Sequence, residues 1–122
     1  MPSVMIVDDE PDVVELVTEI LTGEGYDVVC AQNGEVCLEK LKNTPVDLIL
    51  MDFFMPGMDG RMVIEEIRRN PKLEDTKIAI LTSASFKKRG IEIMKELKVL
   101  DYITKPVELE DFKSRIKKLT GK

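Results

Sequence analysis

The sequence predicts an α/β protein with a doubly wound, five-stranded parallel sheet covered by five helices. Short runs rich in Val, Ile and Leu alternate with longer segments whose apolar residues recur every three or four positions. This alternation is typical of buried strands separated by amphipathic helices. The 122 residues, 43% apolar and 34% charged, can bury one core. A single domain spanning residues 1–122 is therefore expected.

The strands are predicted at the short apolar runs. They lie near residues 3–7, 27–31, 46–51, 77–81 and 100–103. Because a helical segment separates each strand from the next, the strands should run parallel, with helices on both faces. Right-handed crossovers then place ligands at the carboxyl ends of the strands.

The helices are predicted between the strands, near 11–22, 34–42, 60–69, 86–97 and 108–119. Pro11 suits a first turn, and Gly23 and Gly25 lie just past the end of the first helix. The buried face of the first helix is expected to contain Val13, Leu16, Val17 and Ile20, and that of the last helix Leu109, Phe112, Ile116 and Leu119.

The composition argues against several classes of protein. The chain has no histidine, and Cys30 and Cys37 form no CxxC pair, so zinc or a disulfide framework is not expected and both cysteines should be small core residues. The net charge of −5 argues against direct nucleic-acid binding. No apolar run is long enough to span a membrane, and the N-terminus lacks a signal-peptide pattern, which predicts a cytoplasmic protein.

Acidic and hydroxyl-bearing residues follow the apolar runs, so parallel strands should bring them to one edge of the sheet. These residues are Asp8 and Asp9, Asp52, Thr82 and Ser83, and Thr104 with Lys105. Three carboxylates in close proximity require a proton or a cation, and Mg²⁺ suits an all-oxygen site. Lys105 could pair with a phosphoryl group, Thr82 could donate a hydrogen bond, and an aspartate could act as nucleophile. Composition alone does not select Asp52 for that role.

Each of these residues also has a structural explanation. Asp8, Asp9 and Glu10 suit the start of a helix, and Asp59 with Gly60 suits a helix cap. Thr82 can be a loop residue, Tyr102 a partly buried strand aromatic, and Lys105 a solvated lysine. Asp52 taken alone can begin a turn. The presence of Asp52 at a second strand end favours the metal site.

The order of four motifs resembles a receiver domain of the two-component response regulators. The motifs are Ile6-Val7-Asp8-Asp9-Glu10, then Leu50 to Gly60 around Asp52, then Leu81-Thr82-Ser83-Ala84, then Asp101-Tyr102-Ile103-Thr104-Lys105-Pro106. The resemblance covers essentially the whole chain, and the single-domain chemotaxis response regulator has the same plan. It implies a flavodoxin-like fold. Lys98-Val99-Leu100 stands where receivers often carry a Gly-Ala pair, which is a local departure.

The resemblance also implies a role for each site residue. Asp52 would be the phosphoacceptor, and Asp8 and Asp9 would hold Mg²⁺ together with Asp52 and the Phe54 backbone carbonyl. Thr82 would be the switch hydroxyl, Tyr102 the switch aromatic and Lys105 the ammonium that contacts the phosphoryl group. The Lys105–Pro106 bond is expected to be cis. Phe54 and Ala84 would flank the path of the hydrolytic water, and neither side chain can orient it.

The predicted function is a phosphorylation-activated signalling receiver rather than a conventional enzyme, although it would catalyse its own phosphorylation and autodephosphorylation. The donor would be a sensor histidine kinase or a phosphotransfer protein, and the recipient of the signal an effector or output domain. Neither nucleic acid nor membrane is an expected direct partner, and a monomer or a phosphorylation-dependent dimer would serve. The output surface would be the fourth helix, fifth strand and fifth helix, including Ile93, Lys113 and Lys117. The chain ends directly after the last predicted helix, so no output domain is expected within it.

Three other functions compete with this prediction. A phosphatase of the haloacid dehalogenase class also uses an aspartate nucleophile and Mg²⁺. That class requires a second aspartate, the general acid, two residues after the nucleophile, and this chain has Phe54 at that position. A flavin-binding protein would have its phosphate repelled by Asp8, Asp9 and Glu10. The third alternative is a receiver-like interaction domain that is not phosphorylated.

Overall fold

A computed structural model describes residues 2–55, 57–83 and 87–121 of the chain, and it has the predicted α/β architecture. Strands and helices alternate throughout: β1 Ser3–Val7, α1 Pro11–Gly23, β2 Asp27–Ala31, α2 Gly34–Leu41, β3 Leu48–Met51, α3 Gly60–Arg69, β4 Lys77–Ser83, α4 Lys87–Leu97, β5 Asp101–Lys105 and α5 Leu109–Thr120. The five strands form one parallel sheet in the order β2-β1-β3-β4-β5. None of the described helices is long and apolar enough to cross a membrane.

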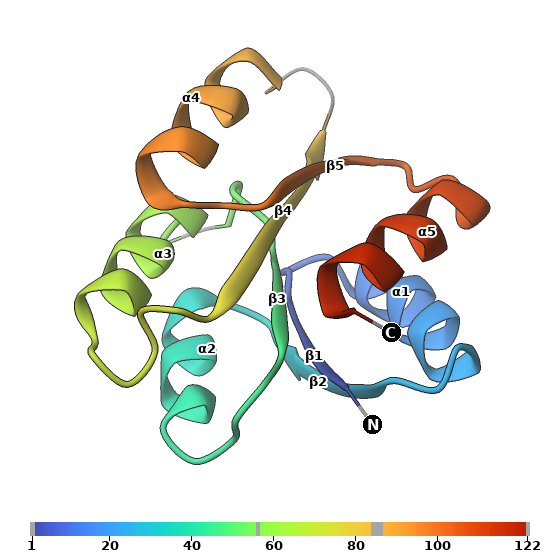
Figure 1. Cartoon of the computed structure of the whole chain (residues 1–122), viewed down its shortest axis with the longest axis horizontal. Coiled ribbons are helices and arrows are strands. Elements are labelled where there is room, and N and C mark those ends of the chain that lie inside the picture. Colours follow the sequence, from blue (N-terminus) through green and yellow to red (C-terminus); the bar gives the residue numbers. More distant parts are fainter. Residues whose placement is uncertain (1, 56, 84–86, 122) are drawn as a thin grey trace.

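Helices cover both faces of the sheet, and each face has its own apolar cluster. Helices α1 and α5 lie on one face, while α2, α3 and α4 lie on the other (Figure 1). Because side chains alternate along a strand, Met5 and Val7 pack toward the second group of helices and Val4 and Ile6 toward the first. The two-sided burial explains why the strands read as continuous apolar runs.

Local signals in the sequence set several helix boundaries. Asn33 Oδ1 accepts a hydrogen bond from the Val36 amide at the start of α2, and Asp59 Oδ1 accepts one from the Met62 amide at the start of α3. These are N-caps, which satisfy backbone donors that the first helical turn leaves unpaired. At the end of α5, Gly121 has φ 72°, the left-handed conformation that favours glycine.

Three strands differ from the predicted ones at their ends. The third strand begins at Leu48 rather than at residue 46, and the last runs over Asp101–Lys105 rather than residues 100–103. Strand β4 continues through Ser83, so Thr82 lies within the strand. In each case the apolar run and the hydrogen-bonded ladder differ by one or two residues, because backbone pairing does not require apolar side chains.

The predicted buried faces of two helices were partly wrong. Leu16 and Leu109 are exposed, because α1 turns Val17 and Leu21 toward the sheet and α5 buries Phe112 and Ile116. Ile93 was expected off the core stripe of α4, yet only 2% of its surface is exposed.

The orientation of α4 explains the burial of Ile93. Gly90, Ile93 and Leu97 repeat at intervals of three and four residues, so they share one face of the helix. Gly90 and Ile93 are buried on that face.

Lys113 was expected on the output surface of α5, but its ammonium lies 3.9 Å from a Glu24 carboxylate oxygen at the end of α1.

The turn before β5, where the sequence departs from the resemblance, is built around Lys98. This residue has φ 58°, a left-handed conformation that is uncommon without glycine. The Val99 amide donates to the Met94 carbonyl at 3.0 Å. The Lys98 carbonyl accepts a hydrogen bond from Arg68 Nη2 at 3.2 Å. Side-chain and backbone hydrogen bonds therefore support this turn, at which receivers often carry a Gly-Ala pair.

Candidate functional site

Two neighbouring strands position the central carboxylates of the site. Val7 pairs with Met51 in the sheet, so the next residues, Asp8 and Asp52, emerge side by side from β1 and β3. The Asp52 amide continues the ladder by donating to the Val7 carbonyl at 2.9 Å. Asp8 is only 1% exposed and Asp52 only 2%. Backbone pairing therefore holds two carboxylates in a nearly water-free position.

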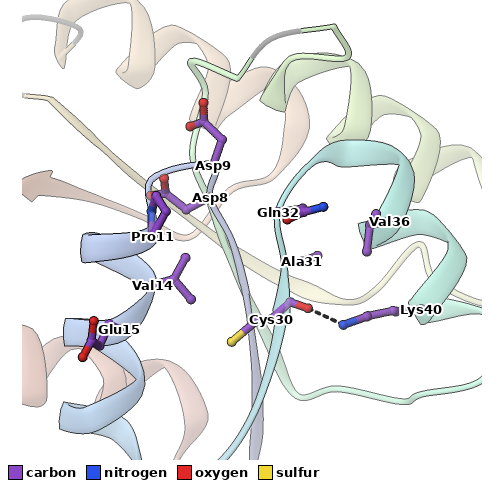
Figure 2. Close-up of a pocket in the computed structure, with 10 residues that line it drawn as sticks. All are labelled: Asp8, Asp9, Pro11, Val14, Glu15, Cys30, Ala31, Gln32, Val36 and Lys40. Carbon is purple, nitrogen blue, oxygen red and sulfur yellow. Dashed lines mark hydrogen bonds between the residues drawn. The ribbon is translucent and has the colours of Figure 1, made fainter.

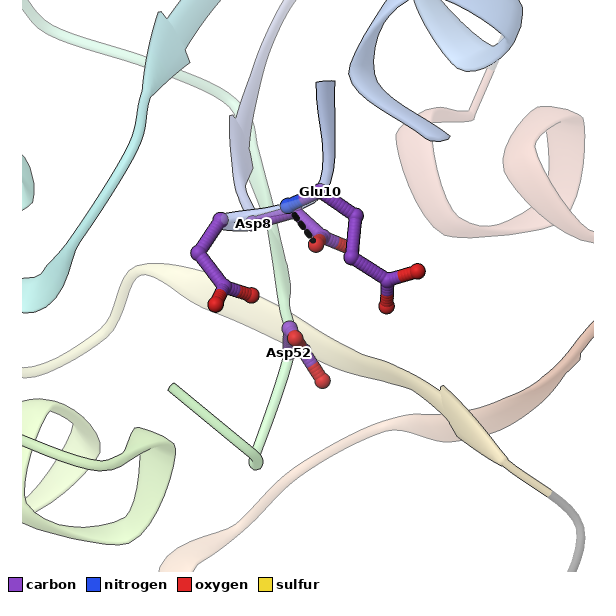
Figure 3. A group of neighbouring side chains, drawn as sticks. Asp8, Glu10 and Asp52 are labelled. Atoms are coloured by element: carbon purple, nitrogen blue, oxygen red, sulfur yellow. Dashed lines mark hydrogen bonds between the residues drawn. The ribbon is translucent and has the colours of Figure 1, made fainter. Parts of the chain in front are cut away.

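Four acidic residues converge at this edge. Asp8, Asp9, Glu10 and Asp52 each offer a carboxylate oxygen, and these atoms lie within 4.8 Å of one another. Figure 3 shows the Asp8, Glu10 and Asp52 side chains gathered beyond the ends of the strands. The donors are all oxygens and no histidine is available, which suits a hard cation such as Mg²⁺. The cluster could hold a metal ion, and binding one would relieve repulsion among its charges.

Lys105 brings the only ammonium to this cluster within the described residues. Its Nζ lies 2.7 Å from Asp8 Oδ2, 3.0 Å from Glu10 Oε1 and 3.7 Å from Asp52 Oδ2. Burial lowers the pKa of Lys105, but its close contacts with the Asp8 and Glu10 carboxylates outweigh this and raise the pKa overall. The ammonium is therefore charged, and it is held more closely by Asp8 and Glu10 than by Asp52.

The surroundings of Asp52 raise its pKa from 3.8 to about 6. Burial is the largest cause, and the charges of Asp8 and Asp9 act in the same direction. The Phe54 amide, which donates to Asp52 Oδ1 at 3.2 Å, and the Lys105 ammonium act against this increase. Burial and repulsion outweigh both groups, so Asp52 loses its proton less readily than an exposed aspartate does.

Thr82 and Tyr102 lie on neighbouring strands beside the carboxylates. Thr82 is buried in β4 and pairs with Thr104 of β5. Tyr102 is also buried, and its hydroxyl donates to the Ser83 carbonyl at 2.6 Å. A Cβ atom at Gly90 would lie 2.2 Å from the Tyr102 ring, so the ring packs directly against the backbone of α4. The aromatic ring thus already occupies an inward position.

Two further predicted residues, Phe54 and Pro106, follow β3 and β5 at the same edge. The Lys105–Pro106 bond is cis, the isomer that the resemblance implies. The Phe54 side chain is 57% exposed. Ala84 lies outside the described residues.

An apolar groove lies next to the acidic cluster (Figure 2). It has a volume of about 470 Å³ and is bordered by Asp9, Val14, Cys30, Val36 and Lys40 among others. The Lys40 ammonium donates to the Cys30 carbonyl. Cys30 is half-buried and contributes to the groove wall, unlike the fully buried Cys37, whose pKa burial raises to about 12. The prediction of two core cysteines therefore fits Cys37 and was wrong in part for Cys30.

Sequence reasoning missed the contact between Glu10 and Lys105. Glu10 was interpreted only as part of an acidic motif, and 95 residues separate it from Lys105. Its position directly after the Asp8-Asp9 pair was the only signal in the sequence. The ion pair itself depends on the Lys105 side chain reaching from the end of β5 across the carboxyl edge of the sheet to the residues that follow β1.

Comparison with known proteins agrees with this architecture. The family model of the response regulator receiver domain matches residues 4–117. A protein of Vibrio cholerae described as a probable cyclic di-GMP phosphodiesterase is 37% identical over 114 residues, which cover 93% of this chain and 25% of that protein. The chain thus spans about a quarter of the length of that relative.

Solved structures of receivers have the same fold. The chemotaxis protein CheY4 of Vibrio cholerae is 25% identical and superposes with a TM-score of 0.90 over 98% of each chain. A CheY-like receiver domain protein of Methanospirillum hungatei is 35% identical, with a TM-score of 0.85 over 98% of this chain and 94% of that one. The receiver domain of a histidine kinase from Syntrophus aciditrophicus is 30% identical, with a TM-score of 0.88 over 99% and 91% of the two chains.

Receiver domains are signalling modules of two-component systems rather than classical enzymes, and they interact with histidine kinases or phosphotransfer proteins. The match of the family model to nearly the whole chain agrees with the parallel sheet and with the acidic cluster at its carboxyl edge. The chain therefore belongs to the response regulator receiver domain family.

Proposed function

We propose that this chain is a phosphorylation-controlled switch in which Asp52 accepts a phosphoryl group from the phosphohistidine of a sensor kinase or phosphotransfer protein. The observation that carries the proposal is the single ammonium of Lys105 beside the buried carboxylates of Asp8 and Asp52. A buried, anionic acceptor next to a cation suits the transfer of an anionic group. The chain has no histidine, so the donor histidine must lie outside these 122 residues.

The transfer forms one bond and breaks another. A carboxylate oxygen of Asp52 attacks phosphorus in line, the P–O bond forms and the P–N bond of the phosphohistidine breaks. The imidazole, protonated on its other ring nitrogen in the donor, leaves as a neutral ring with the bonding electron pair. No proton has to be removed from the nucleophile, because Asp52 reacts as a carboxylate. Lys105 pairs with the transferred phosphoryl oxygens, and Thr82 donates a hydrogen bond to one of them.

Asp8, Asp9, Asp52 and the Phe54 backbone carbonyl are the residues that would hold Mg²⁺. When bound, the ion supplies positive charge that offsets the charge of the arriving phosphoryl group. This fits the acidic cluster, where burial and repulsion raise the pKa of Asp52. Backbone hydrogen bonds support both aspartates, because the Asp8 amide donates to the Ala31 carbonyl at 3.1 Å and the Asp52 amide donates to the Val7 carbonyl at 2.9 Å.

The output is a change in the surface formed by α4, β5 and α5. Movement of Thr82 toward the phosphoryl group and a more firmly held Tyr102 would alter this surface. Because Tyr102 is already buried in the unmodified chain, the switch acts mainly on α4 and on the end of β4. A downstream effector or an output domain would read the change, in the cytoplasm, with the receiver as a monomer or as a phosphorylation-dependent dimer. The Vibrio cholerae relative offers a cyclic di-GMP phosphodiesterase as one class of output.

Mass spectrometry of the intact protein tests the proposal. Phosphoramidate with Mg²⁺ should add one phosphoryl group to the parent protein and none to Asp52→Asn. Asp59→Asn is the matched control, because Asp59 is an exposed N-cap that asparagine replaces well. Full labelling of Asp52→Asn would overturn the assignment of Asp52. An unlabelled parent would favour a receiver that acts without phosphorylation.

A further inference from the structure

Glu10 makes an unusual contact for an exposed side chain. It is 59% exposed, yet its Oε1 lies 3.0 Å from the Lys105 ammonium, whose own side chain is only 15% exposed. The Glu10 amide also donates to Asp8 Oδ1 at 2.9 Å. Glu10 therefore contacts both members of the Asp8–Lys105 pair, with its backbone on one and its carboxylate on the other.

The geometry of Lys105 shows which acceptors its donors already have. An ammonium carries three N–H donors. Asp8 at 2.7 Å and Glu10 at 3.0 Å are within hydrogen-bond distance of Nζ, whereas Asp52 at 3.7 Å is not. Only one donor then remains for a phosphoryl group on Asp52, so a phosphoryl group that pairs with the ammonium through more than one oxygen must displace one of the two close carboxylates.

Glu10 is the carboxylate that can release Lys105 at the lower cost. Asp8 is 1% exposed, so loss of its cation would leave a buried charge uncompensated, which is expensive. The Glu10 carboxylate is mostly in water and is rehydrated when the pair breaks, and ion pairs with an exposed partner contribute little.

We infer that Glu10 is a positioning residue that holds Lys105 away from Asp52 in the unmodified protein and competes with the phosphoryl group for its ammonium. This inference rests on the proposed function, because it assigns the competitor at the same site. By holding Lys105, Glu10 makes the phosphorylated state less favourable. It touches neither the donor nor the phosphorus and acts through Lys105.

Three variants separate a direct contact from a general charge effect. Glu10→Gln removes the charge and keeps the length. Glu10→Asp keeps the charge but is one methylene too short to reach Lys105 in the same way. Glu15→Gln is the matched control, since Glu15 is an exposed carboxylate on α1 that lies outside the acidic cluster and makes no ion pair within the described part of the chain.

The first measurement is NMR relaxation of the Lys105 side chain in magnesium-free protein. Glu10→Gln and Glu10→Asp should both make the end of this side chain more mobile, and Glu15→Gln should leave it as ordered as in the parent. This readout does not depend on phosphorylation. An equally ordered Lys105 in Glu10→Gln would overturn the inference, even if the parent protein accepts phosphate.

The second measurement is the affinity for beryllofluoride, a phosphoryl mimic, at saturating Mg²⁺. Loss of an exposed pair predicts that Glu10→Gln and Glu10→Asp bind it about two- to fivefold more tightly, and that the gain shrinks as salt screens the charges. Equal affinity in the parent and Glu10→Gln, the same gain in Glu15→Gln, or parent-like affinity in Glu10→Asp would each contradict a competing contact. A parent that binds no beryllofluoride and takes no phosphoryl label would instead overturn the proposed function.

Discussion

A partly buried cation lies at each end of the strands of the sheet, and the two cations have different kinds of acceptor. At the amino end, the Arg68 guanidinium donates to four backbone carbonyls: Nε to Leu97, Nη1 to Glu74 and Thr76, and Nη2 to Lys98, at 2.8 to 3.2 Å. At the carboxyl end, the single ammonium of Lys105 is shared among three carboxylates. Arg68 thus has a fixed acceptor in each direction, whereas Lys105 has competing ones.

This difference separates a structural cation from a functional one. The acceptors of Arg68 are neutral backbone groups at the end of α4 and before β4, so the guanidinium joins the end of α3 to both of these segments. The surroundings of Lys105 carry excess negative charge, and Asp8 Oδ2 has the ion pair but no well-aligned hydrogen bond. A region with satisfied donors resists change, and a region with unbalanced charge responds to an arriving cation or phosphoryl group.

The largest expected effect on stability comes from a substitution of Arg68, at the amino end of the strands. Arg68→Met should lower the free energy of unfolding by about 2 to 4 kcal/mol, because several hydrogen bonds to a charged donor are lost at once. Urea unfolding measures this loss. Arg69→Met is the control, since Arg69 makes only an exposed pair with Glu66 and should change stability by less than about 0.5 kcal/mol. A loss below 1 kcal/mol for Arg68→Met would show that water replaces the guanidinium there.

At the carboxyl end of the strands, removal of the Asp52 charge should instead stabilise the fold. The pKa of Asp52 is raised from 3.8 to about 6, so the folded state binds the proton more tightly than the unfolded state, and stability falls as the pH rises from about 4 through about 6. Asp52→Asn removes this penalty. In magnesium-free buffer it should gain up to about 3 kcal/mol at pH 7.5, and nothing below about pH 4. Urea unfolding at both pH values checks this, and equal effects at the two would contradict it.

Removal of the exposed aspartate should affect metal binding more than stability. Asp9→Ala should weaken Mg²⁺ binding by about tenfold or more and slow phosphorylation, because one carboxylate of the cluster is lost. The metal-free protein should stay folded and gain slightly from the reduced repulsion. Calorimetric titration with Mg²⁺ measures the change. Asp12→Ala, an exposed acid outside the cluster, is the control, and equal affinity in the Asp9 variant would remove Asp9 from the ligand set.

Access of water to the carboxyl end should set the lifetime of the modified state. The Phe54 side chain cannot hydrogen-bond water, and the same holds for an alanine side chain at position 84. Phe54→Asn together with Ala84→Glu should speed dephosphorylation by about tenfold or more, which needs only about 1.4 kcal/mol of barrier. Loss of label from Asp52 after the donor is removed is the measurement. Decay no faster than in the parent would place control of the lifetime elsewhere.

The smallest effect is a redistribution of backbone dynamics. Hydrogen exchange with and without beryllofluoride should differ around residues 82–105 more than in α2, because only the first region adjoins the site and the output surface. The amides closest to Arg68 should change least within that region. Identical exchange in both states would leave the switch without a conformational output.

Much of the fold follows from local patterns in the sequence. The alternation of strands and helices was predicted for the whole chain, and the parallel sheet with five helices is confirmed. Caps at Asn33 and Asp59 were readable because they act within three residues. The buried faces of α1, α4 and α5 were less predictable, since several apolar residues on one helix compete for the core and packing against neighbours selects among them.

The site, like the fold, could be predicted from the sequence only in part. The sequence by itself determined which side chains stand at the ends of strands, because the apolar runs stop directly before Asp8 and Asp52. It did not determine that Lys105 would lie closer to Asp8 and Glu10 than to Asp52, or that Gly90 would let Tyr102 lie against α4. Only the tertiary structure decided these contacts, because they join residues far apart in the chain and depend on differences of about an ångström in how neighbouring elements pack.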